Sequence, residues 1–206
     1  MPRGDSVRHR RALVDLIVDR AHYDEVVQRA LGQARVSLWI GTANVKDVRV
    51  EAPIGSVARA RGRYLSITER FVELVRRGVE IRILHARPPS RAFRSALAAT
   101  RALEPPLFEM RECPRTHLKT IAVDGSYLYL GSANFTGAGL GARGDERRNF
   151  EIGIATEDDV LLDEVQRRFD DIWSGRECAG CKLRAQCPKP IDTLVEKRKR
   201  RARSVR

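Results

Sequence analysis

The 206-residue sequence predicts an α/β fold, in which a mixed β-sheet is flanked by helices on both faces. Short runs of β-branched and aromatic residues mix with amphipathic segments, and apolar residues make up 42% of the chain. We find no internal repeat. The length allows one domain of about 150 to 180 residues with short appendages. We therefore expect a main domain at 1–175, a small Cys-rich extension at 176–192 and a basic, disordered tail at 193–206.

Periodicity places the elements of this fold along the chain. The expected helices lie at residues 11–32 (one or two helices), 66–77, 90–103 and 158–173. The expected strands lie at residues 35–42, 79–84, 107–113 and 149–156, with a hairpin inside 116–137.

Caps and turns fix several of these boundaries. Ser66, with Glu69 three residues later, forms a capping-box pattern, and Gly78 stops the helix that follows. Asp124 and Gly125 are expected to make the tight turn of the hairpin. Residues 43–65 are rich in Gly, Arg and Ala without a clear period, so they form either an irregular loop or a mobile flap.

The chain carries a net charge of +12, and seven Lys and Arg lie in the last ten residues. A polybasic tail favours polyanions, chiefly because binding releases condensed counterions. Nucleic acid and an anionic membrane surface both fit this tail, and a solvated tail without a specific partner is the alternative.

Membrane insertion and export are not indicated. No run approaches the roughly 18 apolar residues that a membrane span needs. The basic N-terminus has its apolar positions interrupted by Asp15, Asp19 and Arg20, unlike a signal peptide. We expect a cytoplasmic protein.

The predicted hairpin carries polar residues at its open end. On a strand, His117 and Lys119 would share one face, because residues two apart point the same way. The return strand should bring Ser132 and Asn134 back beside them. An imidazole, an ammonium, a hydroxyl and a carboxamide would then meet without a carboxylate cluster for Mg²⁺. This set suits metal-free phosphoryl chemistry, with the imidazole as nucleophile. Glu151, with Asn149 beside it, is the best candidate for a carboxylate near the ring.

The spacing of these residues resembles the HKD signature of the phospholipase D superfamily. The residues that match it are His117, Lys119, Asp124, Gly131, Ser132 and Asn134, followed by the trailing element Asn149-Phe150-Glu151. The order of elements over residues 12–173 is consistent with one domain of this family. The resemblance implies a metal-independent phosphodiesterase with a phospholipase D-like mixed sheet.

The resemblance also implies roles for single residues. His117 would form a phosphohistidine, Lys119 and Asn134 would bind the phosphate, and Ser132 would assist there. Glu151 would orient a histidine, and Asn149 would join the substrate-binding set. We include Asp124 in the catalytic set. It looks more like a residue that holds the turn and a hydrogen-bond network than like a chemical group, and a residue that only forms the turn is the alternative.

The mechanism that the resemblance implies needs two histidines, one to attack phosphorus and one to protonate the leaving oxygen. The chain has four histidines, and His9, His22 and His85 lack the pattern. We interpret His9 as solvated, His22 as part of a helix and His85 as a strand-end residue. The second group should come from another copy of the chain, so we expect a homodimer through the active site.

The four cysteines are Cys113, Cys178, Cys181 and Cys187. Disulfides are not expected in the cytoplasm. The C-x2-C-x5-C spacing of the last three resembles the cluster ligands of adenine DNA glycosylases and, with a remote first cysteine, of iron–sulfur RecB-like nucleases. This resemblance implies a structural [4Fe–4S] cluster with Cys113 as the fourth ligand. Zinc is the alternative, and free thiols remain a third interpretation.

Three functions remain open at this point. A nuclease that acts on DNA or RNA, and more specifically an endonuclease, is favoured by the charge, the basic tail and the cysteine pattern. A phospholipase D or phosphatidyl transferase is permitted by the motif but should show an apolar surface or an export signal. A nucleic-acid-binding subunit of a restriction or repair complex is the third.

Overall fold

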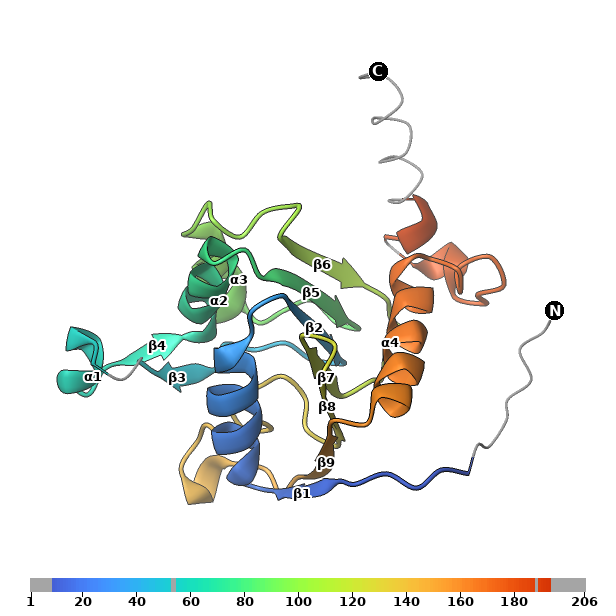
Figure 1. Ribbon diagram of the computed structural model, residues 1–206. Coiled ribbons are helices and arrows are strands. Elements are labelled where there is room, and N and C mark those ends of the chain that lie inside the picture. The colour runs from blue at the N-terminus through green and yellow to red at the C-terminus, as the bar shows by residue number, and fades with distance from the viewer. Residues whose placement is uncertain (1–8, 53–54, 188, 194–206) are drawn as a thin grey trace.

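A seven-stranded mixed β-sheet forms the centre of the computed structural model, which describes residues 9–52, 55–187 and 189–193 (Figure 1). The strand order across the sheet is β1-β9-β8-β7-β2-β5-β6. The strands are β1 (Asp15–Val18), β2 (Ser37–Thr42), β5 (Glu80–His85), β6 (Phe108–Glu112), β7 (Thr120–Val123), β8 (Tyr127–Gly131) and β9 (Ile152–Thr156). Strands β2, β5 and β6 are parallel, and all other neighbours pair antiparallel.

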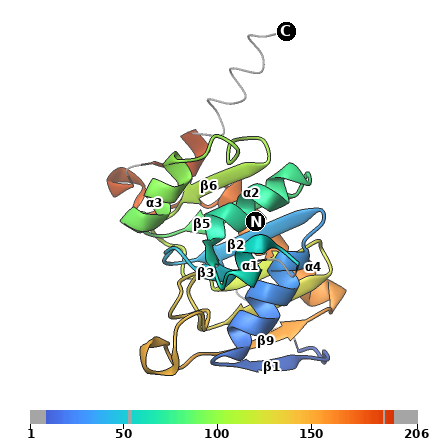
Figure 2. The same cartoon turned by 90° about the vertical axis from the view of Figure 1, so that its left-hand side faces the viewer.

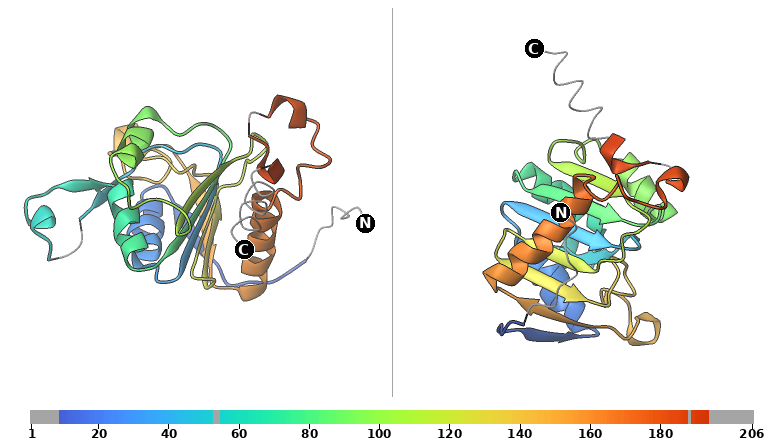
Figure 3. Two further views of the ribbon diagram at one scale, coloured as in Figure 1. Left: turned by 90° about the horizontal axis from the view of Figure 1, so that it is seen from above. Right: turned by 90° about the vertical axis from the view of Figure 1, so that its right-hand side faces the viewer.

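Helices cover both faces of this sheet, as Figure 3 shows in the view from above. One face carries the π-helix η1 (His22–Ala30) with the 3-10 turn η2 (Leu31–Gln33), α2 (Ile67–Arg76) and α3 (Arg91–Ala98). The opposite face carries α4 (Asp159–Trp173). The expected α/β architecture, a mixed sheet flanked by helices on both faces, is therefore confirmed.

Aromatic side chains fill the core on both sides of the sheet. Phe71 of α2 is fully buried and stacks on Phe135 at a ring-centroid distance of 6.0 Å. On the α4 face, Phe169 stacks between Trp39 and Trp173 at 5.2 Å and 5.6 Å. Burying each ring removes a large apolar area from water, at about 25 cal/mol per Å². Both helical layers are thereby fixed to the sheet.

The predicted start of α2 is confirmed in detail. The Ser66 side chain caps the helix, and the Ser66 backbone N–H donates to Glu69 Oε1 at 2.9 Å, which completes the capping box. Gly78, with a φ of 87°, follows the last turn. A left-handed residue at this place is reached most easily by glycine.

The predicted helix over residues 11–32 is only partly correct. Residues 15–18 form β1, an edge strand that pairs with β9, and the helical turns begin at His22. Only Ile17 of this strand is buried; Leu16 and Val18 point to the opposite face, because side chains alternate along a strand, and Asp15 is exposed at its start. The apolar residues fitted a helical period, but the hydrogen bonds offered by β9 decided the outcome.

Residues 43–65 are more regular than expected. They contain β3 (Arg49–Glu51), the short helix α1 (Val57–Ala60) and the start of β4 (Tyr64–Ser66), which pairs with β3. This hairpin projects from the body of the molecule in Figure 1 and faces the viewer in Figure 2. The other predicted helices and strands are present, most of them with shorter bounds: α3 ends at Ala98 rather than at 103, whereas β5 extends one residue beyond its prediction to His85.

The Cys-rich segment follows α4 and contains a 3-10 turn, η4 (Arg184–Gln186). Ile191 is buried in a cluster with Leu84 and Phe169, so this segment packs against the sheet. The division at residues 175 and 192 stays a prediction, and residues 194–206 of the basic tail lie outside the described residues. Within the described part of the chain, no helix is long and apolar enough to cross a membrane.

Candidate active site

One edge of the sheet gathers the polar residues that the sequence singled out. The parallel strands β2, β5 and β6 end at this edge. The antiparallel strands β8 and β1 end there as well, whereas β7 and β9 begin there. Segments far apart in sequence therefore meet at this edge. They include the residues before Thr120 and the residues from Ser132 to Glu151.

His117 and Lys119 lie in the extended segment just before β7. Lys119 Nζ lies 3.4 Å from both ring nitrogens of His117 and 3.3 Å from its carbonyl oxygen. The Lys119 carbonyl accepts a hydrogen bond from the Gly131 N–H at 3.1 Å, which fixes this pair next to Ser132. His117 is exposed at the edge. An ammonium group beside an imidazole suits the binding of an anionic phosphate oxygen.

Ser132, Glu151 and Asn149 form a second hydrogen-bonded set. Ser132 Oγ donates to Glu151 Oε2, and Asn149 Nδ2 donates to Glu151 Oε1 at 3.0 Å. The Ile152 N–H donates to Ser132 Oγ at 3.1 Å. Both oxygens of the carboxylate are thus occupied, and the hydroxyl is oriented by two partners.

Asn134 is held by its side-chain oxygen. Thr42 Oγ1 and the Asn44 N–H both donate to Asn134 Oδ1 at 3.3 Å. Thr42 is buried and also accepts the Phe135 N–H at 2.9 Å. Because the oxygen is engaged, the amide nitrogen is the end left to donate toward a ligand.

The structure thus brings His117, Lys119, Ser132, Asn134, Asn149 and Glu151 to one edge, in three linked sets. The expected orientation of a histidine by Glu151 is not formed with His117. Within the described residues, the hydrogen bonds of that carboxylate come from Ser132 and Asn149. The roles of all these residues stay proposals.

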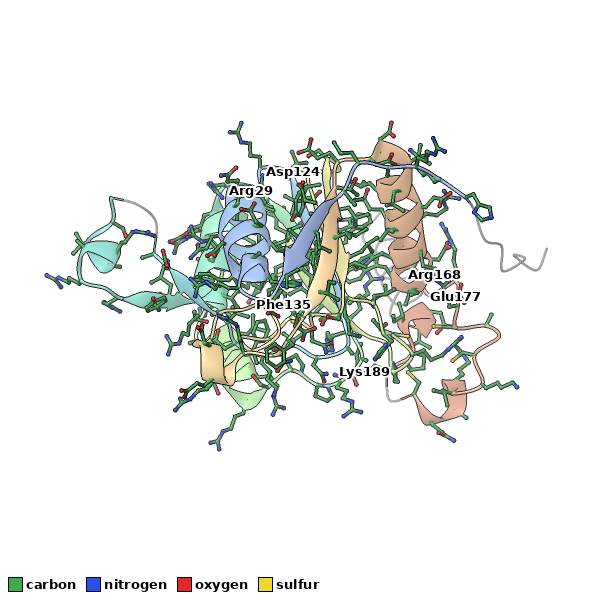
Figure 4. All side chains as sticks on the ribbon, turned by 90° about the horizontal axis from the view of Figure 1, so that it is seen from below. Arg29, Asp124, Phe135, Arg168, Glu177 and Lys189 are labelled. Atoms are coloured by element: carbon green, nitrogen blue, oxygen red, sulfur yellow. The ribbon has the colours of Figure 1, made fainter. Side chains whose placement is uncertain are left out.

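Asp124 lies at the other end of the hairpin from His117 and Lys119, so the structure gives no support to its inclusion in the catalytic set. Its carboxylate accepts the backbone N–H groups of Arg35, Val36 and Ser37 at 2.9, 2.7 and 2.8 Å. Figure 4 labels Asp124 well away from Phe135, the residue after Asn134. The interpretation of Asp124 as a residue that holds the turn and its network is the one that fits.

Two of the remaining histidines are buried. Burial lowers the pKa of His22, although the Asp19 carbonyl and the nearby Glu151 act in the opposite direction. Burial likewise lowers the pKa of His85, whose Nδ1 lies 2.9 Å from the Arg87 carbonyl. His9 is exposed. The rings of His22 and His85 are both buried, whereas His117 is exposed.

Sequence reasoning missed Asp19. This residue follows β1, and its Oδ1 accepts the Glu151 N–H at 2.9 Å. The only sequence signal was a polar residue directly after a short apolar run, and that run was assigned to a helix. Pairing of β1 with β9 was needed to reveal the contact.

The four cysteines line one pocket. The pocket lies between the residues that follow β6 and the Cys-rich segment, and Cys113, Cys178, Cys181 and Cys187 all contribute to its wall. The described residues contain no group of three or more His, Cys, Asp or Glu arranged to hold a metal ion. The expected cluster therefore lacks support in the observed side-chain arrangement. All four thiols are free of disulfides.

The fold and this edge define an α/β protein of the phosphodiesterase class. The family model described as "Cardiolipin synthase, PLD-like domain" matches residues 27–173. The chain therefore belongs to the PLD-like domain family of the phospholipase D superfamily, whose members are generally phosphodiesterases and typically need no metal for catalysis.

Two solved structures, with TM-scores above 0.5, show the same fold at low sequence identity. NucT from Helicobacter pylori is 14% identical with a TM-score of 0.53, covering 78% of this chain and 95% of NucT. The phospholipase D family member Nuc from Salmonella typhimurium is 20% identical with a TM-score of 0.51, covering 80% of this chain and 95% of Nuc. Phosphatidylserine synthase from Haemophilus influenzae is 17% identical with a TM-score of 0.49, covering 91% of this chain and 45% of the synthase. A search of curated proteins gives no match.

The location of Asp124 predicts a purely structural effect of its substitution. Asp124→Ala removes three charge-assisted hydrogen bonds. It also places alanine at a φ of 55°, which alanine tolerates less well than aspartate. We therefore expect the free energy of unfolding to fall by about 2 to 4 kcal/mol. Asp124→Asn keeps an acceptor oxygen and should cost less. Thermal denaturation measures both, with the exposed Asp163→Ala as control. An Asp124→Asn protein that is stable but inactive would restore a chemical role for this residue.

Proposed function

We propose that this protein is a metal-independent nuclease that cleaves phosphodiesters of DNA or RNA through a phosphohistidine at His117. A ring nitrogen of His117 attacks phosphorus, and the P–N bond forms as the bond to the leaving oxygen breaks. Water then cleaves the P–N bond and releases the product. The observation that carries the proposal is the contact of Lys119 Nζ with the His117 ring, 3.4 Å from its nitrogens.

The other polar groups at the edge fit this chemistry. Lys119 and the amide nitrogen of Asn134 would bind phosphate oxygens, where charge is concentrated in the transition state. Ser132 and Asn149 would extend this binding set. Both also hold the Glu151 carboxylate, which keeps the three side chains in one rigid arrangement. We assign Glu151 a general electrostatic role near the attacking ring.

A nucleic acid is supported as substrate by the charge around the edge. Exposed basic residues extend from several loops that meet there, namely Lys46, Arg87, Arg115, Arg143 and Arg147. Cations spread over such a surface bind a polyanionic backbone through many weak contacts. The net charge of +12 acts in the same direction.

A lipid substrate has one supporting observation. The sequence showed no apolar surface, but the structure exposes Phe150 by 93% and Ile152 by 58%, on either side of Glu151. Exposed apolar groups beside a phosphodiesterase site suit an acyl chain as well as a protein partner. Phospholipase D or phosphatidyl transferase activity is therefore the second candidate. A binding subunit of a restriction or repair complex is the third, and it has no observation of its own.

We also propose that two copies of the chain complete the site. The exposed apolar residues continue from Phe150 and Ile152 onto Leu16 and Val18, because Val18 pairs with Ile152 across β1 and β9. These two strands extend beyond α4 in the right-hand view of Figure 3. A second copy on this surface would bury it and bring His117 of the partner subunit to the opposite side of the phosphate. That histidine would protonate the leaving oxygen.

For the cysteines we propose a structural [4Fe–4S] cluster held by all four thiolates, with zinc as the alternative. Support comes from the shared pocket and from successive turns, in which the N–H groups of Cys178, Cys181 and Cys187 bond to carbonyls three residues earlier. Four cysteines match the ligand number of either centre. In a cubane each thiolate binds a different iron, so the thiols need not converge on one ion. The centre would fix the 176–192 extension to the domain; the cytoplasmic location stays a prediction.

Loss of the imidazole tests the nuclease proposal. In EDTA, wild-type protein should cleave labelled DNA or RNA, and His117→Ala should lower the rate by at least about 10³-fold, as removal of a covalent nucleophile does. The exposed His9→Ala is the matched control and should keep full activity. A denaturation-stable phosphorus label on wild type but not on His117→Ala would identify the adduct. Turnover of a choline lipid without nucleic-acid cleavage would select the lipase, and binding without turnover the third function.

A charge placed on the exposed apolar surface tests the two-copy proposal. Phe150→Asp should shift the protein from dimer to monomer in analytical ultracentrifugation, because a buried unpaired carboxylate costs several kcal/mol at an interface. The activity per chain of the wild-type protein should fall when the protein is diluted and return when it is concentrated. Val57→Asp, at an exposed apolar residue of α1, is the control. A strictly monomeric wild-type protein with full activity would exclude the proposal.

Metal analysis tests the cysteine proposal. Protein purified without oxygen should contain iron and sulfide with visible absorbance, and Cys113→Ser should lose both along with thermal stability. Ala179→Ser, in the same segment, should retain them. One zinc per chain without iron would select the alternative centre. Neither metal in freshly isolated protein would mean that the four thiols are free.

A further inference from the structure

Asp19 adopts an unusual backbone conformation directly beside the proposed site. It follows the last residue of β1 and has a φ of 45°, in the left-handed region. Among residues with a side chain, Asp and Asn reach this region most readily. Its neighbour across the sheet is Glu151, which precedes the first residue of β9.

The left-handed turn changes which atom of Asp19 pairs with Glu151. The regular register of β1 and β9 ends at Val18 and Ile152. Beyond it, the Asp19 N–H donates to the Glu151 carbonyl at 2.9 Å, as in an ordinary ladder. The return bond, however, runs from the Glu151 N–H to Asp19 Oδ1, also at 2.9 Å. A side-chain oxygen thus replaces a backbone carbonyl at this single step.

The displaced carbonyl of Asp19 has partners of its own. It accepts the His22 N–H at 3.1 Å, and His22 Nδ1 lies 2.9 Å from it. A β-carbon at Gly141 would come within 2.9 Å of the same oxygen, so this loop packs directly on the turn. The conformation of Asp19 is therefore fixed by groups from η1 and from the loop before η3 (Asp145–Arg147).

Glu151 depends on this contact for its location. Its carboxylate binds Ser132 and Asn149, but its backbone lies where β9 leaves the sheet. On the β8 side the hydrogen bonds go to Ile152, whose N–H and carbonyl both bond to Ser132. The two bonds from Asp19 hold the Glu151 backbone itself. A shift of this residue would move the hydroxyl and the amide that its carboxylate orients.

We propose that Asp19 is a positioning residue for Glu151, and through Glu151 for Ser132 and Asn149 of the site. The catalytic part of this inference rests on the proposed function. Asp19 itself touches neither substrate nor reacting atoms. The Asp19 carbonyl is turned toward His22 and cannot accept the Glu151 N–H. The Asp19 carboxylate accepts it instead, so the hydrogen bonds between the two strands extend one residue further.

Three substitutions of Asp19 separate the effect of losing the acceptor oxygen from the effect of backbone strain. Asp19→Asn keeps an acceptor oxygen and the tolerance for positive φ. Asp19→Gly keeps the tolerance but loses the acceptor, and Asp19→Ala loses both. We expect Asn to retain near wild-type kcat, whereas Gly lowers kcat by about 10- to 100-fold with little change in KM, as a displaced catalytic group does. The Ala variant should show the same loss together with a lower Tm.

A double-mutant cycle with Glu151→Gln tests whether Asp19 acts through Glu151. In the Glu151→Gln background, Asp19→Gly should cause no further loss of kcat, since the group it positions is already altered. Equal losses in both backgrounds would overturn the proposal, and so would a fully active Asp19→Gly. A Gly variant whose defect is only a lower Tm would assign Asp19 a structural role.

Amide hydrogen exchange of Glu151 supplies a readout that needs no activity. The Glu151 N–H should exchange faster in Asp19→Gly than in wild type or Asp19→Asn, because only the Gly variant loses its acceptor. Unchanged exchange would overturn the positioning role. If wild-type protein exchanged as expected but cleaved no phosphodiester, the proposed function would fail while the Asp19–Glu151 contact stood.

Discussion

The register of the β7–β8 hairpin places Lys119 beside Gly131, and so brings His117 and Lys119 next to Ser132. Because side chains alternate on a strand, a slip of one residue would turn Lys119 and its neighbours to the other face. Asp124 and Gly125 fix this register with φ values of 55° and 65°, the signs that a type I′ turn requires. The Asp124 carboxylate then ties the turn to the start of β2 through three backbone N–H groups. The residue therefore supports the site from the far end of the sheet.

The two-copy proposal rests on how this fold distributes its histidines. The sheet places His117 at an exposed edge, while His22 and His85 are buried under the helical layers with lowered pKa values. Among the histidines, His117 and His9 are exposed, so the two-copy proposal assigns the second proton donor to another copy of the chain. The apolar surface beside Glu151 gives such a partner something to cover.

Long-range contacts link the edge to the rest of the molecule. Asp19 connects β1 to Glu151, and the Cys113 N–H donates to the His85 carbonyl at 2.8 Å, just before the segment that carries His117. The cysteine pocket therefore adjoins the loop that leads to the nucleophile. A metal centre there would stabilise this loop. Loss of the metal centre would therefore change the backbone that leads to His117.

The sequence by itself determined the fold class, most elements and the six polar residues of the edge, because periodicity, caps and a close motif are local properties. Only the tertiary structure decided that residues 15–18 form a strand, that Asp124 lies away from the site, and that Asp19 holds Glu151. Each of these depends on pairing between segments about 90 to 140 residues apart, such as Asp124 with Val36 or β1 with β9. Local propensity carries no information about such pairing, so no sequence pattern could reveal it.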